Sequence, residues 1–353
     1  MKTILVVGDN CPTGHRSSST CLNKFCGYRD FIEEQGWEMK KVGYKGLLRN
    51  ELPEIEGEIT VMFFFPYIYW NENIENDPDE VYGNSDFGKK FNELFYTTES
   101  IIYNSYGDDV RYVNSPSGIM TDRDKKHAKE ILWKNNIPTP KWWENLGIES
   151  IHEMLDDGRK IYAKPRYGSM GKGISVLTKD RWMTNFDYKD GKIKSMLSDY
   201  GWKFREMEKD DEFLRTLLRN DFLFEEGIKT PRINDRKFDL RVYAVYKETP
   251  YYYARSAPPE AITTNISQGQ SSGEDMGGRT EGKEFLDLIP EDKLEEAKNN
   301  ALETAQILGL NYAGVDIIFS EDYEETYVLE AQSFPSPESR FDLMKYIIEK
   351  ITS

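Results

Sequence analysis

The sequence has 353 residues, with 46 Lys and Arg against 62 Asp and Glu, which gives a formal net charge of −16 at pH 7. A chain this acidic is repelled by nucleic-acid backbones and anionic membranes, and it contains no run of five basic residues. Hydrophobic residues at 38% can build a core, which excludes a disordered chain. No apolar stretch reaches the roughly 20 residues of a membrane span. We therefore expect a soluble, cytoplasmic protein.

Residues 1–118 have the pattern of a small α/β domain. Strands are predicted at 3–7, 60–65 and 110–113, with a helix at 25–35, and this alternation favours a parallel sheet with crossover helices. The polar, turn-rich stretch 67–88 is predicted to be a long loop or insertion. Cys11, His15, Cys21 and Cys26 could supply four zinc ligands, but their spacing fits no common zinc motif. An odd number of cysteines also does not indicate a disulfide framework.

Residues 119–221 are predicted to form a second unit. Thr121 is the expected N-cap of a helix that carries residues 125–134 and ends before the prolines that follow Ile137. A short strand at 161–164 leads into a glycine-rich turn, and residues 186–218 are polar with Leu and Met at helical spacing. Residues 222–353 are predicted to form a third unit, with a helix at 291–308 and strands at 222–226, 239–246, 312–319 and 325–330, the last two as a hairpin.

The first motif is the glycine-rich turn that follows Lys164. Its backbone N–H groups and the nearby lysine could bind an anion, because glycine lets the backbone approach phosphate oxygens closely. The turn does not have P-loop spacing, since Lys172 is followed by Gly173 rather than by Ser or Thr. An ordinary hairpin turn is the alternative.

The second motif is a pair of acidic residues, Asp316 and Glu330, each within an apolar strand pattern. A carboxylate in a buried strand is costly unless a cation meets it, and two on adjacent strands suit Mg²⁺, which prefers oxygen ligands. Either acid taken alone could simply face solvent.

The third motif alternates charged and apolar residues, so that Lys237, Asp239 and Arg241 would lie on one face of a strand. Three charged side chains on one face suggest anion binding, with an exposed strand as the alternative. Arg255 and the segment 263–269 place a cation and an amide near another glycine turn.

In this order, the motifs resemble those of the ATP-grasp superfamily, from about Asp124 to Pro335. The chain is most similar to amino-acid and peptide ligases such as ribosomal-protein glutamate ligases and tubulin-tyrosine ligases. The resemblance implies an α/β (α+β) ATP-grasp fold, with the parallel-sheet domain 1–118 preceding two subdomains, 119–221 with a lid and 222–353 with a metal site.

The resemblance also implies roles for individual residues. Catalytic roles are implied for Arg241, Arg255 and Asn265. Nucleotide binding is implied for Lys125, Lys164, Ser169, Met170, Gly171, Gly173, Glu225, Glu226, Gly227, Ile228, Lys237 and Asp239. Mg²⁺ would be held by Asp316, Glu330 and Gln332, where the family usually has Asn in place of Gln332.

The activity implied is an ATP- and Mg²⁺-dependent ligase that joins a carboxylate to an amine through an acyl phosphate. Phosphoryl transfer requires charge neutralisation more than acid–base chemistry, and the three histidines form no nucleophile–base arrangement. The substrates would be a small-molecule or peptide carboxylate and an amine, with no nucleic acid and no membrane. A small-molecule kinase and a nucleotide-binding module without turnover are the alternatives. The oligomeric state stays open, with a homo-oligomer as one option.

Overall fold

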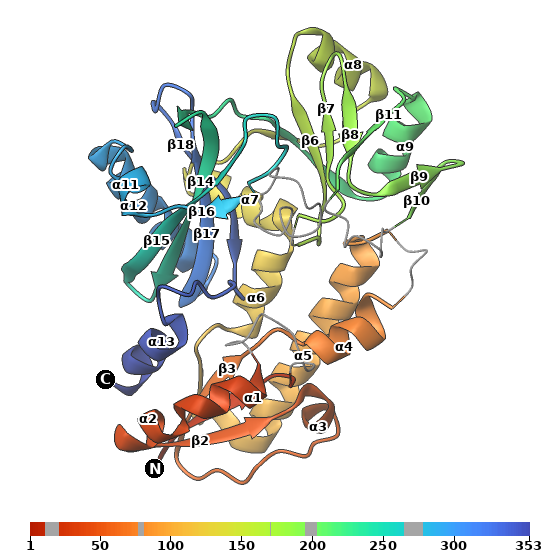
Figure 1. Ribbon diagram of the computed structural model, residues 1–353. Coiled ribbons are helices and arrows are strands. Elements are labelled where there is room, and N and C mark those ends of the chain that lie inside the picture. The colour runs from red at the N-terminus through yellow and green to blue at the C-terminus, as the bar shows by residue number, and fades with distance from the viewer. Residues whose placement is uncertain (11–20, 77–80, 170, 195–202, 265–277) are drawn as a thin grey trace.

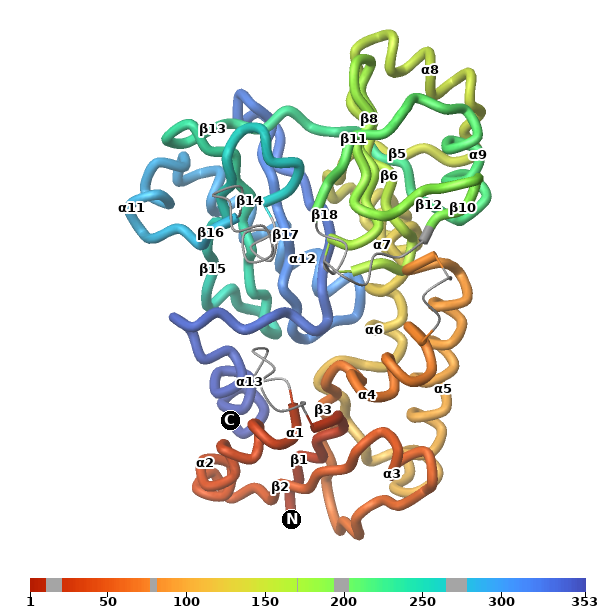
Figure 2. The backbone as a smooth tube through the Cα atoms, turned by 45° about the vertical axis from the view of Figure 1, so that its right-hand side comes forward, coloured from red at the N-terminus to blue at the C-terminus, as the bar shows by residue number. Residues whose placement is uncertain are grey.

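The structure is a computed structural model that describes residues 1–10, 21–76, 81–169, 171–194, 203–264 and 278–353. Within these residues, three sheets of four or more strands divide the chain (Figure 1). Figures 1 and 2 both show the N-terminal sheet at one end of the molecule, with the other two sheets side by side at the opposite end.

The N-terminal sheet is parallel and has the strand order β2-β1-β3-β4, which confirms the predicted parallel α/β unit. Its centre is β1, whose residues from Thr3 onward are all buried, as expected for a strand covered on both faces. The strands are β1 (Lys2–Val7), β2 (Trp37–Val42), β3 (Glu58–Phe63) and β4 (Val110–Tyr112). The helical segments are α1 (Leu22–Phe25), η1 (Cys26–Tyr28), α2 (Arg29–Glu34), α3 (Tyr44–Leu48), α4 (Tyr67–Tyr69), η2 (Trp70–Ile74), α5 (Ser85–Tyr106) and η3 (Gly107–Asp109).

The predicted long loop 67–88 is wrong where the structure describes it, because it contains α4, the π-helical turn η2 and the first turn of α5. The Asn84 side chain caps α5 by accepting from the N–H groups of Asp86 and Phe87. Buried aromatic residues at Phe87 and Phe91 then attach α5 to the sheet. The polar composition of this stretch is typical of a loop, so it did not indicate the caps and turns that produce these helices.

The cysteines form no zinc cluster in the described part of the chain, where no group of three or more His, Cys, Asp or Glu could hold a metal ion. Cys11 and His15 lie outside the described residues. Cys21 is disulfide-bonded, contrary to the expectation from the odd number of cysteines, and Cys26 is a free thiol.

The central unit is an antiparallel sheet with the order β11-β8-β7-β6-β12-β5 and a separate β9–β10 hairpin. Its strands are β5 (Trp142–Trp143), β6 (Ile161–Pro165), β7 (Ser175–Leu177), β8 (Trp182–Thr184), β9 (Asp187–Lys189), β10 (Lys192–Lys194), β11 (Arg205–Met207) and β12 (Phe222–Glu226). Its helices are α8 (Ile148–Asp156) and α9 (Asp211–Arg219), and α6 (Pro116–Arg123) and α7 (Lys125–Lys134) lead into it.

The N-cap of α7 is Asp124 rather than the predicted Thr121, because the Asp124 carboxylate accepts from the His127 N–H at 3.1 Å. Thr121 lies inside the preceding helix α6, which starts with Pro116 after its own N-cap Ser115. Two capped helices therefore follow each other directly, and their junction positions Lys125.

The C-terminal sheet is antiparallel, in the order β16-β15-β14-β17-β18, with β13 paired to β14. The strands are β13 (Arg232–Ile233), β14 (Arg236–Val245), β15 (Glu248–Ala257), β16 (Arg279–Thr280), β17 (Tyr312–Phe319) and β18 (Thr326–Gln332), and the helices are α11 (Lys283–Leu286), α12 (Glu291–Ile307) and α13 (Leu343–Thr352). The predicted hairpin of β17 and β18 is confirmed. A row of buried alanines, Ala297, Ala301 and Ala305, lets α12 pack closely on this sheet.

The three units do not divide at the predicted residues. The position 118/119 lies inside α6, and β12, which begins at Phe222, pairs with β6 in the central sheet. Helix α13 shares a core with the N-terminal sheet, because Ile347 and Ile348 pack in one cluster with Ile4. Within the described residues, no helix combines the length and apolar character required to cross a membrane.

Candidate functional site

Charged side chains lie directly opposite one another on neighbouring strands of the C-terminal sheet. Arg241 on β14 is opposite Asp316 on β17, and Asp316 is opposite Glu330 on β18. On the other side of β14, Asp239 is opposite Arg255 on β15. Register alone therefore brings five predicted site residues together, since opposite side chains in an antiparallel pair are nearest neighbours.

The two arginines and two aspartates form a buried ion-pair network. Arg241 makes a two-pronged pair with Asp316 through Nε and through Nη2, the latter at 2.9 Å. Arg255 donates from Nε to Asp239 at 2.7 Å and from Nη2 to Asp316 at 2.9 Å. Burial alone would lower the pKa of Arg255, but the two carboxylates raise it, so both guanidinium groups stay charged. Thr264 donates to the other oxygen of Asp239.

A glycine makes room for one of these arginines. A Cβ on Gly314 would lie 2.7 Å from the Pro335 Cβ and 3.0 Å from the Arg241 Cδ. The absence of a side chain on this residue of β17 therefore lets Arg241 cross the strand toward Asp316.

Glu330 is held by a lysine and an amide. Lys125 Nζ lies 3.2 Å from one Glu330 oxygen, and Gln332 Nε2 donates to the other at 2.8 Å. Burial would raise the pKa of Glu330, but Lys125 and Lys164 outweigh it and lower the pKa to about 2. The Gln332 Oε1 accepts from Arg241 at 3.1 Å, which joins Glu330 to the arginine network.

The central sheet contributes a second group of charges. Lys164 on β6 pairs with Glu225 on the adjacent strand β12, and Lys129 on α7 lies 3.1 Å from the other oxygen of Glu225. Burial lowers the pKa of Lys164 to about 7, with a further contribution from Lys129. Burial also lowers the pKa of Lys129 to about 7, and its Nζ donates to Thr139 at 2.7 Å.

Lys129 was not predicted as a site residue. Its signal in the sequence is its position four residues after Lys125, which places both lysines on one face of α7. Helix α7 therefore carries two lysines into the same group of carboxylates, one toward the C-terminal sheet and one toward the central sheet.

The glycine-rich turn begins beside Lys125, whose Nζ donates to the Gly168 carbonyl at 2.6 Å. The Ser169 hydroxyl is 2.8 Å from the Tyr82 hydroxyl, and Gly171 and Gly173 have φ values of 71° and 77°. A Cβ on Gly173 would lie 2.5 Å from the Pro165 Cγ, so only glycine fits there. Met170 lies outside the described residues, as does Asn265 in the C-terminal unit.

The predicted hinge 225–228 differs from the expectation in one respect. The Glu226 N–H donates to the Lys141 carbonyl at 2.8 Å and the Gly227 N–H to the Lys160 carbonyl at 2.7 Å, so these amides are already used. Ile228 follows them in the chain and is half-buried. The N–H groups of Glu226 and Gly227 are therefore not available to an adenine edge.

Lys237 lies on β14. Its Nζ donates to the Ala261 carbonyl, and burial, with a contribution from Lys160, lowers its pKa to about 7. Tyr162 on β6 was not predicted as a site residue, and its hydroxyl donates to the Ile262 carbonyl at 3.2 Å. The Tyr162 contact connects β6 of the central sheet to the segment that follows β15 in the C-terminal unit.

The donor set suits a hard divalent cation. Asp316, Glu330 and Gln332 offer two carboxylates and an amide oxygen, which is the chemistry that Mg²⁺ prefers when phosphate oxygens and water complete its shell. In this structure, the same oxygens contact Arg241, Arg255 and Lys125.

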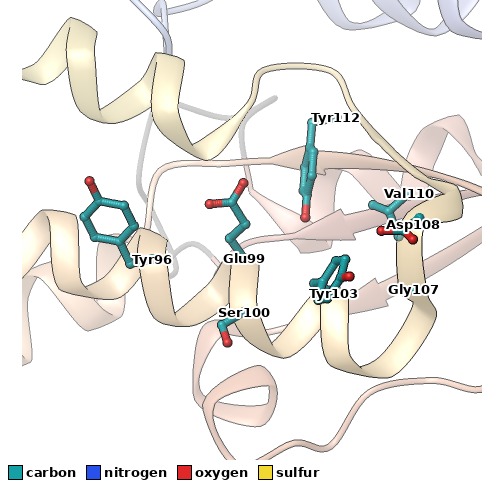
Figure 3. A pocket seen from close by; sticks show the side chains of 8 residues that line it. All are labelled: Tyr96, Glu99, Ser100, Tyr103, Gly107, Asp108, Val110 and Tyr112. Atoms are coloured by element: carbon teal, nitrogen blue, oxygen red, sulfur yellow. The ribbon is translucent and has the colours of Figure 1, made fainter.

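A cavity on the N-terminal unit is separate from this group of charges. It has a volume of about 390 Å³ and lies between α5 and β4 (Figure 3). Its lining residues are Tyr96, Glu99, Ser100, Tyr103, Gly107, Asp108, Val110 and Tyr112. Since none of them is a lysine or arginine, this cavity does not suit phosphate.

Two antiparallel sheets that share a buried group of lysines, arginines and carboxylates define a protein of the ATP-grasp class. The family model for YheC/D-like ATP-grasp proteins matches residues 124–352, and the chain belongs to this family.

Individual relatives agree with this class. The tetrahydromethanopterin:alpha-L-glutamate ligase of Methanocaldococcus jannaschii is 30% identical over 230 residues, which cover 64% of this chain and 63% of that protein. The D-alanine–D-alanine ligase of Bacillus anthracis has a TM-score of 0.56 and 14% identity, over 99% of this chain and 92% of that one. A RiPP-associated ATP-grasp ligase of Chryseobacterium gregarium, solved with ADP and a leader and core peptide, has a TM-score of 0.54 and 18% identity, over 99% and 96%. These solved structures share the fold.

Proposed function

We propose that this protein is an ATP- and Mg²⁺-dependent ligase that joins a carboxylate to an amine through an acyl phosphate. Its family and the name of the Methanocaldococcus jannaschii relative support a ligase. The observation that carries the proposal is the convergence of Lys125 and Lys164 with Asp316 and Glu330. Lys125 contacts Glu330 at 3.2 Å, and both Glu330 and Asp316 act on the pKa of Lys164.

This arrangement suits phosphoryl transfer better than acid–base catalysis. Amide formation in water is uphill, so the carboxylate must first be activated. The carboxylate oxygen attacks the γ-phosphorus of ATP, and the bond to the β–γ bridging oxygen breaks, which releases ADP. The amine nitrogen then attacks the acyl carbon, the bond from carbon to the phosphate oxygen breaks, and inorganic phosphate and a proton leave. Both steps need fixed cations along the transferred group.

The residues divide this work by position. Lys125 and Lys164 would neutralise the phosphates from the α7 and β6 sides, and residues 169–173 would cover them. Asp316, Glu330 and Gln332 would hold Mg²⁺, which supplies charge neutralisation at the phosphate oxygens when bound. Arg241 and Arg255 would then orient the carboxylate and the acyl phosphate.

The arginines also suggest the substrate class. Arg241 and Arg255 are close enough to share Asp316, so together they form a site for one anionic group. Arg232 does not join them, because it is exposed and pairs with Asp235 at 3.4 Å. We therefore expect a single carboxylate on an amino acid or a peptide to occupy this position.

The test is an ADP-release assay with pools of amino acids and short peptides, with hydroxylamine present to trap an acyl phosphate and mass spectrometry of the products. We expect ADP release that depends on a carboxylate substrate, together with a hydroxamate. The Asp316→Asn variant should lose ADP release and keep the circular-dichroism spectrum of the wild type. ADP release without hydroxamate would instead indicate a kinase with a hydroxyl acceptor. Nucleotide binding without any release would indicate a binding module.

A further inference from the structure

The glycine-rich turn is held by the N-terminal unit as well as by the domain that carries it. Its two ends are fixed by a residue of α7 and by a residue that directly follows β8. Lys125 holds the Gly168 carbonyl at 2.6 Å, and Asn185 Nδ2 donates to the Gly171 carbonyl at 2.7 Å. The Asn185 Oδ1 accepts from the Ile174 N–H at 2.7 Å, which anchors the exit of the turn. These contacts all involve backbone groups of the turn, so its side chains interact with other parts of the chain.

The side chains of the turn contact the segment between η2 and α5. Lys172 Nζ pairs with Glu75 Oε1 at 3.0 Å and lies 5.0 Å from the centre of the Tyr82 ring. The Tyr82 hydroxyl contacts the Ser169 hydroxyl at 2.8 Å and accepts from the Ser169 N–H at 3.2 Å. The side chains of Lys172 and Glu75 are only 18% and 19% exposed, so the pair is largely screened from water.

Glu75 is itself held in place. Trp70 Nε1 donates to its second oxygen at 2.8 Å, and the Arg123 guanidinium lies 4.5 Å from the centre of the Trp70 ring. Arg123 is the last residue of α6, two residues before Lys125. The carboxylate that holds Lys172 is therefore connected to the helix junction that positions Lys125.

Lys172 can exchange this partner without moving the body of the turn. Its flexible four-carbon side chain can reach a new partner, while Gly171 and Gly173 on either side, both with positive φ, keep the backbone of the turn in place. The turn also starts beside Lys125, one of the two lysines proposed to neutralise the phosphates. A terminal phosphate carries more charge than one carboxylate and accepts more hydrogen bonds, so it can compete with Glu75 for the ammonium group.

We propose that Lys172 is a third phosphate-binding lysine of this site, and that Glu75 of the N-terminal unit holds it until nucleotide phosphate displaces the carboxylate. This inference rests on the proposed nucleotide site. It makes the N-terminal unit a competitor of the nucleotide for the glycine-rich turn.

The test compares the dissociation constants of a non-hydrolysable ATP analogue with Mg²⁺ and of AMP, measured by isothermal titration calorimetry. The Glu75→Gln variant keeps an acceptor for Trp70 but loses the charge that holds Lys172. We expect it to bind the analogue about fivefold more tightly, which is the effect of one ion pair, and to bind AMP with unchanged affinity. The Lys172→Gln variant should bind the analogue more weakly, and Glu75→Gln should have no effect in that background.

A matched control is Glu72→Gln. Glu72 lies in the π-helical turn η2, just before Glu75, but pairs with Lys45 at 3.0 Å, so this change should leave analogue affinity unaltered. An unchanged or weaker affinity in Glu75→Gln, or an unchanged affinity in Lys172→Gln, would overturn the inference while leaving the proposed function in place. Equal gains for AMP and the analogue would overturn it too. A wild type that binds no analogue would instead refute the proposed function, and the inference with it.

Discussion

Replacement of Glu225 by Gln should destabilise the protein in a strongly pH-dependent manner. The Glu225 side chain is only 3% exposed and lies between two lysines, with Lys129 at 3.1 Å from one oxygen and Lys164 bonded to the other. The variant keeps the size of the side chain and removes its charge. Two buried ammonium groups are then left next to each other without the anion between them.

The size of the effect follows from the lysine pKa values. Both lysines have a pKa of about 7 in the folded protein, below the usual 10.5, chiefly because of burial. The unfolded chain therefore binds more protons between pH 7 and 10.5, and the free energy of unfolding rises with pH across that window. Loss of Glu225 lowers both pKa values further and extends the window below pH 7. For each pH unit below the wild-type pKa, each lysine then lowers the free energy of unfolding of the variant, relative to wild type, by about 1.4 kcal/mol.

Urea denaturation of wild type and Glu225→Gln at pH 6, 7, 8 and 9 measures this difference. We expect a loss of about 3 kcal/mol at pH 6 that shrinks strongly by pH 8, where the lysines are neutral in both proteins. Glu226→Gln, at the next position of the same strand and half-buried, is the control and should show no such dependence. A loss of equal size at pH 6 and pH 8 would refute the reasoning from buried lysine charge.

Two further variants probe other buried groups. Burial raises the pKa of Asp122 to about 6 from the usual 3.8, although it accepts from the Ser333 N–H, so the free energy of unfolding should fall as pH rises from about 4 to 6. Asp122→Asn should therefore stabilise the protein by about 1–3 kcal/mol at pH 7 and by little at pH 4 in urea denaturation, and equal effects would contradict this. Gly314→Ala should force Arg241 or Pro335 to move and cost about 1–3 kcal/mol, measured as a lower thermal midpoint, whereas an unchanged midpoint would show that the strand has room.

Much of the site could be predicted because its residues lie on regular strands. Period-two alternation placed Lys237, Asp239 and Arg241 on one face, and the structure brings the latter two into one network with Asp316. The apolar neighbours of Glu330 similarly indicated a carboxylate on a buried strand. Strand register converts such local patterns into contacts between distant residues.

The contacts that escaped prediction are those between elements far apart in the sequence. Lys129 lies on a helix whose pattern is satisfied without any site role, and Glu75 lies in a stretch that has the composition of a loop. Nothing local to Glu75 indicates that Lys172, nearly a hundred positions later, will meet it. The boundary at Phe222 was misplaced for the same reason, because the pairing of β12 with β6 is a long-range choice.

The buried carboxylates of Glu225, Glu330 and Asp316 are each paired with a cation in the structure. Glu225 is paired with Lys164, Glu330 with Lys125, and Asp316 with Arg241 and Arg255, as buried charges require. The oxygens proposed to hold Mg²⁺ thus compete with bound cations. When phosphate draws those cations away, the oxygens become available, so nucleotide and metal should each increase the affinity for the other.

This coupling predicts that Mg²⁺ binds the free protein weakly and binds at least about tenfold more tightly when ADP is present, within the range of ordinary coupling energies. Calorimetric titration of Mg²⁺ into the protein, with and without saturating ADP, measures this change in Mg²⁺ affinity. A titration of Mg²⁺ into ADP alone is the blank. In Asp316→Asn the gain should be largely lost, because one of the two carboxylates is gone. An equal Mg²⁺ affinity with and without ADP would mean that the ion pairs of the free protein do not control access to these oxygens.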